Sequence, residues 1–253
     1  MKKEKITEKQ KKYYAETASE YDNSHILETE HELALSQLIG YLSYYNVNSL
    51  LDVGAGTGRV LRHAGEKLPD LKIMGVEPVD ELREVAYKNG VTTDSLVAGD
   101  ACKLNFEDDS WDIVCAFGIL HHIPDVEKAV AEMCRVARHG IFFSDLNNFG
   151  CGSITQRMIS QTLHSLKLWK PFQWVINGGR HDKFSEGDGV YYSYSLFDSL
   201  KTIRKKFPQI HLSNTKGTGK NLYRECSHLS VFAVKSDDDL AELNPKNLNA
   251  LRK

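Results

Sequence analysis

The stretch Leu51-Asp52-Val53-Gly54-Ala55-Gly56-Thr57-Gly58-Arg59 decides how this sequence is interpreted. An apolar run ends there in glycines at alternate positions, which predicts a buried strand, a tight turn and then a helix. Glycine lets the turn bring its backbone close to a ligand, and the first turn of a helix offers free N–H groups. The stretch therefore predicts a ligand site at the end of the first strand.

The spacing of these glycines argues against two common nucleotide sites. A dinucleotide fingerprint needs a glycine where Arg59 stands, and a phosphate loop needs a Gly-Lys-Ser/Thr sequence that is absent here. A dehydrogenase is therefore the least favoured function. The carboxylate of Asp52, at the strand end, suits a cationic or hydroxyl-bearing ligand better than a pyrophosphate.

Two more carboxylates stand at the ends of expected strands. Glu77 lies nineteen residues after Gly58 and ends the strand expected at 71–78, and Asp100 ends the one expected at 95–101. In doubly wound folds an acid at the first place binds the ribose hydroxyls, and the second could accept a hydrogen bond from an adenine amino group. Each acid alone also fits an ordinary solvated cap, but the three features in this order predict a nucleoside site.

Strands and helices alternate along most of the remaining chain. Further strands are expected at 111–118, 140–146, 209–213 and 228–234, and helices at 2–21, 29–41, 126–138, 154–168 and 195–207. This alternation predicts an α/β, doubly wound parallel sheet with helices on both faces.

Residues 147–192 interrupt that alternation, because they are rich in Gly, Ser, Asn and aromatic residues and show no strand pattern. We interpret them as an insertion after the fifth strand that caps the substrate site. Residues 1–253 then form a single domain, with a helical lid at 1–45 and a polar C-terminal tail at 236–253.

Composition limits the partners. The 253 residues include 32 Lys and Arg against 34 Asp and Glu, a formal net charge of −2, which makes nucleic acid an unexpected partner. No apolar run reaches the ~20 residues that cross a bilayer, and the N-terminus does not resemble a secretory leader. No membrane partner is therefore expected. Five cysteines without a C-x-x-C pair predict reduced thiols, a cytoplasmic location and no metal.

Over about residues 10–146 the chain resembles the class I S-adenosylmethionine-dependent methyltransferases, and is similar to the small-molecule enzymes of ubiquinone and menaquinone biosynthesis. The motifs that carry the resemblance are YYAETASEYD (13–22), LLDVGAGTGR (50–59), GVEP (75–78), AGDA (98–101) and FEDDSWDIVCAFGILHHIPD (106–125). The resemblance implies a Rossmann-like seven-stranded sheet in the order 3-2-1-4-5-7-6, with the last strand antiparallel. It also implies S-adenosylmethionine as cofactor, S-adenosylhomocysteine as product, a small-molecule acceptor and a monomer or homodimer.

Carried over by position, the resemblance implies a set of cofactor contacts. Asp52 and the Gly54–Gly58 loop would cradle the methionine part, Glu77 would bind the ribose, and the Phe117 backbone would face the methionine amino group. Pro78, Asp100 and Ala101 would border the adenine, while Tyr21 and His122 would lie beside the cofactor. The implied cofactor residues are Tyr21, Asp52, Gly54, Ala55, Gly56, Gly58, Glu77, Pro78, Asp100, Ala101, Phe117 and His122.

Catalytic and substrate residues are less sharply indicated. His121 could act as a general base and Asp145, at the end of the fifth strand, could face the acceptor. A packing histidine and a loop cap are the alternatives. In the insertion, basic residues among aromatic ones fit an anionic acceptor, phosphorylated or sugar-linked, although a solvated cap surface fits as well. The substrate candidates are Arg157, Arg180, His181 and Tyr192.

The function predicted from these features is methyl transfer from S-adenosylmethionine to oxygen or nitrogen of a small metabolite. An RNA-modifying methyltransferase and a non-catalytic cofactor-binding module are the alternatives. The first is disfavoured by the near-neutral charge, and the second by the intact glycine loop with Glu77 and Asp100.

Overall fold

The computed structural model describes residues 2–20 and 29–236 of the chain. The strands are β1 Ser49–Val53, β2 Lys72–Val76, β3 Leu96–Val97, β4 Trp111–Phe117, β5 Ala137–Leu146, β6 Asp182–Ser185, β7 Gly189–Tyr192, β8 Gln209–Gly217 and β9 Cys226–Val234. The helices are α1 Lys2–Thr17, α3 Thr29–Tyr45, α4 Arg59–Lys67, α5 Asp80–Lys88, α6 Val126–Val136, α7 Ile154–Ser165, α8 Trp169–Ile176, α9 Leu196–Ile203 and α10 Leu222–Glu225. Most of the predicted tail and part of the predicted lid, including Tyr21, lie outside the described residues.

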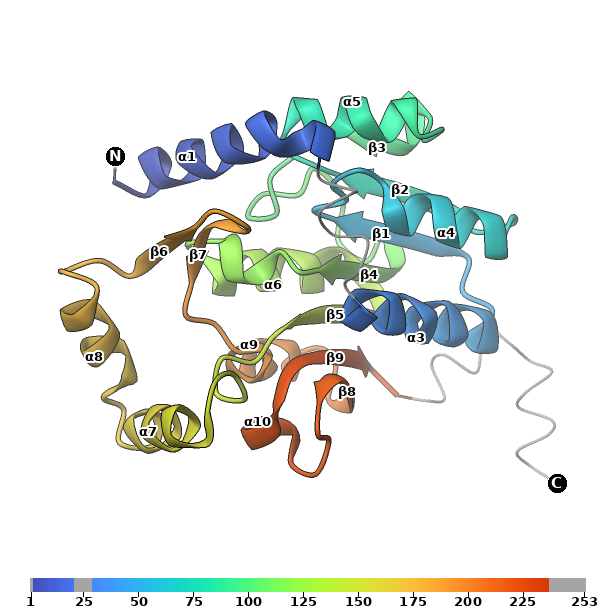
Figure 1. The fold of residues 1–253 in the computed structure, drawn as a ribbon. Coiled ribbons are helices and arrows are strands. Elements are labelled where there is room, and N and C mark those ends of the chain that lie inside the picture. The colour runs from blue at the N-terminus through green and yellow to red at the C-terminus, as the bar shows by residue number, and fades with distance from the viewer. Residues whose placement is uncertain (1, 21–28, 237–253) are drawn as a thin grey trace, which may run out of the picture.

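A seven-stranded sheet in the order β3-β2-β1-β4-β5-β9-β8 forms the centre of the molecule (Figure 1). β1 pairs in parallel with β2 and β4, whereas β9 runs antiparallel to both β5 and β8. The predicted Rossmann-like α/β fold and its strand order are thus confirmed. Because β1 to β4 are parallel, their carboxyl ends meet at one edge of the sheet, where ligands bind in open α/β folds.

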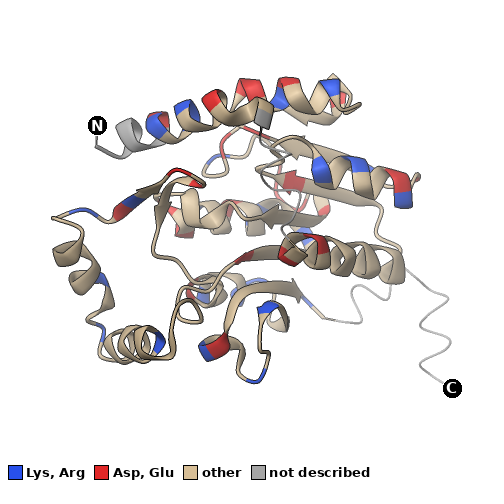
Figure 2. Cartoon of the chain, viewed as in Figure 1, with Lys and Arg blue, Asp and Glu red and all other residues tan. Residues whose placement is uncertain are grey.

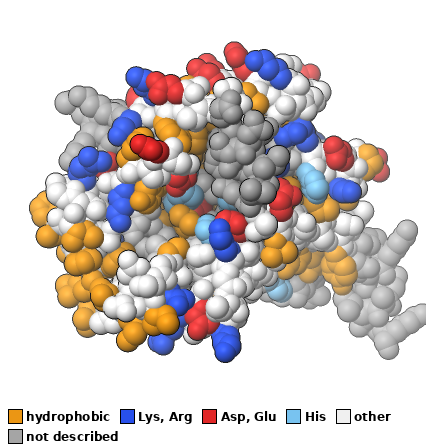
Figure 3. All heavy atoms as spheres, viewed as in Figure 1, with side chains coloured by type: hydrophobic (Ala, Val, Ile, Leu, Met, Phe, Trp, Pro, Cys, Tyr) orange, Lys and Arg blue, Asp and Glu red, His pale blue; other side chains and the backbone are white. Residues whose placement is uncertain are grey.

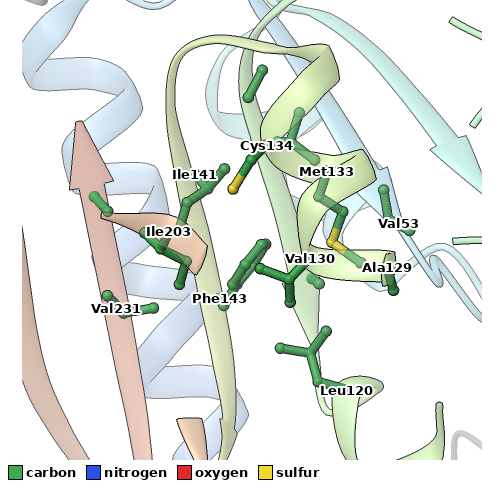
Figure 4. Close-up of a cluster of buried hydrophobic side chains, with 14 of the residues drawn as sticks. Val53, Leu120, Ala129, Val130, Met133, Cys134, Ile141, Phe143, Ile203 and Val231 are labelled. Carbon is green, nitrogen blue, oxygen red and sulfur yellow. The ribbon is translucent and has the colours of Figure 1, made fainter. Parts of the chain in front are cut away.

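Helices cover both faces of the sheet, and consecutive residues of its strands enter opposite cores. Phe143 of β5 packs in a cluster with Met133 of α6 and Ile203 of α9 on one face (Figure 4). Its neighbour Phe142 packs on the other face, with Leu38 of α3. Burial on both faces explains why the central strands consist almost entirely of apolar residues.

The structure corrects two expectations about secondary structure and adds one helix. The third strand, expected over 95–101, is limited to β3, because the chain turns at the isolated bridge between Asp100 and Lys103. The insertion contains a sheet element after all, the antiparallel hairpin β6–β7. Residues 169–176 of the insertion, for which the sequence predicts no element, form the helix α8, and Pro171 stands in its first turn, where a missing N–H is tolerated.

Helix α1 spans the sheet edge between α5 and the β6–β7 hairpin (Figure 1). Tyr13 donates a hydrogen bond from its hydroxyl to the Glu186 carbonyl at 2.7 Å, and the Val190 N–H donates to the side chain of Gln10. The N-terminal helix and the insertion therefore meet over the carboxyl ends of the strands. Within the described residues, no helix is both long and apolar enough to cross a membrane.

Candidate active site

The glycine loop has the backbone conformation that its sequence predicts. Gly54, Gly56 and Gly58 all have positive φ, at 75°, 53° and 78°. A Cβ on Gly54 would lie 2.7 Å from a methyl carbon of Ile119, and one on Gly58 would lie 2.6 Å from Val91, so both sites are closed by packing. A Cβ on Gly56 would meet nothing within 4 Å. Gly56 is therefore the position at which the loop opens towards a ligand, while Gly58 caps helix α4.

Two pockets open beside this loop, and six lining residues are common to both. The larger, here called the polar pocket, has a volume of about 470 Å³ and is lined by Tyr14, Glu30, His31, Glu32, Asp52, Gly54, Ala55, Gly56, Thr57, Arg59, Val60, Arg62, Phe117, Gly118, His121, His122, Leu146, Gly187, Asp188 and His228. The smaller, here called the apolar pocket, has about 210 Å³ and is lined by Gln10, Lys11, Tyr14, Gly54, Gly56, Val76, Glu77, Pro78, Val79, Leu82, Gly99, Asp100, Ala101, Cys102, Phe117, Gly118, Ile119, His122, Ile123 and Pro124. The shared residues place the two pockets next to each other at the edge of the sheet, and we call the pair the cleft.

Asp52 forms the floor of the polar pocket. Its side chain is fully buried, and its Oδ1 accepts only a weak hydrogen bond from the Cys115 thiol at 3.5 Å. Its Oδ2 is buried without any hydrogen-bond partner among the described residues. Burial raises the pKa of Asp52 to about 7. A buried carboxylate oxygen without a partner is costly unless a ligand supplies a donor, and a cationic donor matches it best.

Glu77 lies in the apolar pocket, at the end of β2. Its Oε2 accepts a hydrogen bond from the N–H of Gly56 at 3.0 Å, and its Oε1 accepts one from the N–H of Val79 at 2.9 Å. Burial raises the pKa of Glu77 to about 7, against the opposing effect of these two bonds. Each carboxylate oxygen keeps a second lone pair, so a pair of neighbouring hydroxyls could donate to both. Glu77 thus connects the glycine loop to the apolar pocket.

Most of the remaining predicted cofactor residues line one or both pockets. Pro78, Asp100 and Ala101 line the apolar pocket, and Asp100 accepts a hydrogen bond from the Cys102 N–H at 2.8 Å. Ala55 lines the polar pocket, and Phe117 and His122 line both pockets. The strand ends therefore bring together every predicted cofactor residue except Gly58, which lies behind the loop, and Tyr21, which is outside the described residues.

His121 is held between two carboxylates. Its Nδ1 lies 2.7 Å from Oδ1 of Asp145, which also accepts from the Leu120 N–H through Oδ2, and its Nε2 lies 3.5 Å from Asp188. Burial acts to lower the pKa of His121, but Asp145 and Asp188 outweigh it and raise the pKa to about 10. The imidazole therefore carries two protons at neutral pH. Asp145 lies beneath His121 and does not line either pocket in the described chain.

His122 is oriented by a second set of contacts. Its Nδ1 lies 2.7 Å from the carbonyl oxygen of Val190, and its Nε2 lies 3.0 Å from the Tyr14 hydroxyl and 3.3 Å from Asp188. The imidazole of His122 is thus held between a backbone carbonyl, a tyrosine hydroxyl and a carboxylate. His122 thus connects the N-terminal helix, the hairpin and the cleft.

His121, His122 and Asp188 also present one potential metal-ligand atom each, and these atoms lie within 4.8 Å of one another. A metal ligand must be a neutral imidazole with a free lone pair. His121 instead faces a carboxylate at each nitrogen, and His122 Nε2 lies 3.0 Å from the Tyr14 hydroxyl. The contacts of these three groups fit an ion-pair network at the wall of the polar pocket.

The predicted substrate residues lie elsewhere in the insertion. None of the four lines either pocket within the described part of the chain. Arg157 lies on α7 near the Arg224 carbonyl, at 3.4 Å, and Arg180 pairs with Asp182 at 2.7 Å. His181 is exposed, and the buried hydroxyl of Tyr192 has no hydrogen-bond partner among the described groups. The insertion reaches the cleft instead through the hairpin turn, at Gly187 and Asp188.

Several pocket residues are not identifiable from the sequence. Asp188 and His31 are two of them. Burial lowers the pKa of His31 to about 4, so this imidazole is neutral at the pocket wall. Glu30 lies beside it and pairs with Lys216 at 2.7 Å. Among these additional pocket residues, Tyr14 has a sequence signal, because it belongs to the motif at 13–22.

Comparisons with known proteins agree with this geometry. Residues 51–144 match a family described as a methyltransferase domain. The chain is 36% identical over 91 residues to a demethylmenaquinone methyltransferase of Roseiflexus castenholzii, covering 36% of this chain and 38% of that protein. It is 31% identical over 119 residues to a phosphatidylethanolamine N-methyltransferase of Cereibacter sphaeroides, covering 40% and 50%. The chain thus spans half or less of the length of these two curated relatives.

Solved structures share the fold at low sequence identity. A methyltransferase of Thermotoga maritima, described as a possible histamine N-methyltransferase, aligns with a TM-score of 0.55 at 17% identity, over 88% of this chain and 99% of that one. One from Listeria monocytogenes aligns with a TM-score of 0.57 at 15% identity, over 82% and 97%. The family match over residues 51–144, the partial relatives and the shared fold thus confirm the resemblance to the class I S-adenosylmethionine-dependent methyltransferases.

Proposed function

We propose that the chain binds S-adenosylmethionine in the joined pockets and directs its methyl group to oxygen or nitrogen of a small acceptor. The observation that carries the proposal is the buried Oδ2 of Asp52, which has no partner among the described residues and lies in the polar pocket. An ammonium group, such as that of the cofactor's methionine part, would supply the missing donor.

The other parts of the cofactor fit the same cleft. Glu77 offers two carboxylate oxygens to the ribose hydroxyls, in the slot that Val76, Val79 and Leu82 line with apolar side chains. A flat adenine ring suits a narrow slot of this kind, and Asp100 stands at its edge. When bound, the cofactor supplies an electrophilic methyl group on a sulfonium. The chain's own task is to align the reactants and exclude water, which can contribute roughly 7–11 kcal/mol to lowering the barrier.

The acceptor side of the site is proposed to be the wall formed by His121, His122 and Asp188. The Asp188 side chain is 42% exposed, so its carboxylate can accept a hydrogen bond from an incoming hydroxyl or amine. His121 already carries its proton, because two carboxylates raise its pKa to about 10. We therefore infer that His121 holds Asp188 in place and keeps it ionised, and that it does not act as the general base expected from sequence.

An anionic acceptor remains part of the proposal, on different residues. Arg59 and Arg62 line the polar pocket, and Arg59 lies 3.6 Å from Glu32. A phosphate or carboxylate on the acceptor could compete for Arg59 by a bidentate contact. Arg157 and Arg180 could touch only an acceptor that extends beyond the pocket. Action in the cytoplasm as a monomer or homodimer is also proposed, consistent with five unpaired cysteines.

The direct test is transfer of a labelled methyl group to a panel of neutral and anionic metabolites, with total RNA as a separate substrate. We expect label in a small molecule, and a lower kcat in Asp188→Asn with little change in cofactor affinity. Glu186→Gln, two residues away on the same hairpin, is the matched control. Label found only in RNA would favour the nucleic-acid alternative. Cofactor binding without transfer to any substrate would favour the non-catalytic module.

A further inference from the structure

Helices α7 and α8 of the insertion turn their apolar side chains outwards. The buried residues of these helices are the polar Ser160 and Gln173. Met158 is 64% exposed and Val175 is 67% exposed. A surface helix of a globular protein normally shows the opposite pattern, with its apolar stripe against the core.

The exposed apolar side chains are concentrated in this one part of the molecule. Of the thirteen large hydrophobic residues that are exposed in the described chain, ten lie between 154 and 184. Figure 3 shows hydrophobic side chains gathering at the end of the molecule where Figure 1 places α7 and α8. Phe184 stands on β6 and packs against the Tyr13 ring. We call the surface formed by the other nine the cap face; its members are Ile154, Met158, Ile159, Leu166, Leu168, Phe172, Trp174, Val175 and Ile176.

The cap face is exposed although its two helices are firmly attached. The ring of Phe149 is buried and lies 4.3 Å from that of His164 and 5.9 Å from that of Trp169. The indole N–H of Trp169 donates to the Ser193 hydroxyl at 2.9 Å, and the Gln161 amide donates to the Phe149 carbonyl at 2.9 Å. These contacts hold the polar side of the helix pair against the body, which leaves the apolar side facing outwards.

The charged residues of α7, α8 and the segments that adjoin them have a single sign. Residues 146–181 contain no Asp or Glu but include four basic residues, Arg157, Lys167, Lys170 and Arg180. Figure 2 accordingly shows blue and no red along α7 and α8. Lys167 and Lys170 make no ion pair within the described residues, whereas Arg180 is paired with Asp182.

We propose that the cap face docks onto the surface of an anionic lipid bilayer. Helices that lie in a membrane interface combine exposed aliphatic and aromatic side chains with Lys and Arg and lack acids, and aromatic rings settle at the headgroup level. Trp174 and Phe172 supply the aromatic part here, and Lys167 and Lys170 can meet the lipid phosphates.

A second copy of the chain fits this face poorly. A two-fold contact would place the same cationic surface against itself, and residues 146–181 offer no carboxylate to neutralise it. An anionic bilayer supplies both the apolar layer and the opposite charge. Residues 177–181 alone separate α8 from the hairpin that carries Asp188, so docking would bring the polar pocket near the bilayer surface.

Sedimentation with lipid vesicles tests the proposal without any cofactor or acceptor, so its failure would leave the proposed chemistry untouched. We expect the full chain to sediment with vesicles of phosphatidylcholine and phosphatidylglycerol in equal parts, and to do so less with phosphatidylcholine alone. Raised salt should weaken the binding. The double variant Lys167→Ser/Lys170→Ser should lose about fivefold in partitioning per charge removed.

Val175→Glu should reduce partitioning at least about tenfold, because it places a charge in the apolar contact. The matched control is Leu33→Glu on α3, which is 45% exposed but lies outside the cap face and should bind like the parent chain. Circular dichroism confirms that each variant is folded. No binding by the parent chain, or unchanged binding by Val175→Glu, would overturn the proposal. A dimer in solution that Val175→Glu dissociates would also overturn it, in favour of a second copy.

Discussion

Replacing Glu77 by glutamine should weaken cofactor binding while barely affecting, or even raising, the stability of the free protein. The side chain keeps its shape but loses its charge, and only one of its two terminal atoms can still accept a hydrogen bond. Gly56 and Val79 both donate to this carboxylate, at 3.0 and 2.9 Å. One of these N–H groups therefore loses its acceptor, and the two ribose hydroxyls no longer meet a carboxylate.

The magnitudes follow from the burial of Glu77. Hydrogen bonds to a charged group contribute about 1.5–3 kcal/mol, so affinity for S-adenosylhomocysteine should fall roughly 10- to 150-fold. In the free protein, burial raises the Glu77 pKa from 4.5 to about 7. At pH 8 the ionised carboxylate therefore costs about 3 kcal/mol, which glutamine avoids, against about 1–3 kcal/mol for the unpaired N–H. The free energy of unfolding should consequently change by less than about 2 kcal/mol.

Calorimetric titration with S-adenosylhomocysteine and urea unfolding at pH 8 measure the two effects separately. Glu81→Gln, an exposed acid in the first turn of α5, is the control and should change neither. Parent-like affinity in a folded Glu77→Gln variant would refute the assignment of the ribose to this carboxylate. Loss of affinity together with a large loss of stability would show that Glu77 mainly supports the loop.

Three further predictions concern groups with unusual surroundings. Asp145→Asn should cost about 3–5 kcal/mol of unfolding free energy at pH 7, because it breaks a buried ion pair with His121. The raised pKa of His121 stabilises the fold fully below pH 6.5, and this stabilisation is lost as the pH rises through about 10. An equal loss of unfolding free energy in urea at pH 7 and above pH 10 would therefore contradict the pairing. Gly58→Ala should cost about 1–3 kcal/mol in thermal or urea unfolding, because φ is 78° and Val91 lies 2.6 Å from the new Cβ, whereas Gly65→Ala, inside the helix that Gly58 caps, should be neutral or stabilising. Cofactor affinity should rise between pH 6 and pH 8, because Asp52 and Glu77 ionise near pH 7, and this rise should be smaller in Asp52→Asn. Calorimetric titration at several pH values measures the profile, which would be flat if neither carboxylate binds the cofactor.

The cofactor side of the site could be predicted because its determinants are local in sequence. The positive φ of Gly54, Gly56 and Gly58 follows from the glycines themselves, and a parallel sheet places successive strand ends at one edge. The positions of Asp52 and Glu77 therefore follow from the order of the strands. Their pKa values near 7 do not, since these depend on how completely the folded chain removes water from each carboxylate.

The acceptor side could not be predicted because it depends on contacts between distant residues. His121 contacts Asp145 and Asp188, which are 24 and 67 positions later in the chain, and no local sequence pattern predicts either contact. The short strands of the β6–β7 hairpin lie in a segment without a strand pattern, so the position of Asp188 was missed. The sequence predicts Arg157 and Arg180 as substrate residues, but Arg157 on α7 donates to the Arg224 carbonyl, and Arg180, which follows α8, pairs with Asp182.

The most direct test of the central claim is a calorimetric titration of the full chain with S-adenosylhomocysteine, NAD and ATP in parallel. The glycine loop, the unpartnered oxygen of Asp52 and the Glu77 carboxylate fit an amino group and a ribose, and the loop spacing fits no pyrophosphate. One S-adenosylhomocysteine per chain should therefore bind, more tightly than either of the other two. Tighter binding of NAD or ATP, or no binding of S-adenosylhomocysteine by the folded chain, would contradict the account.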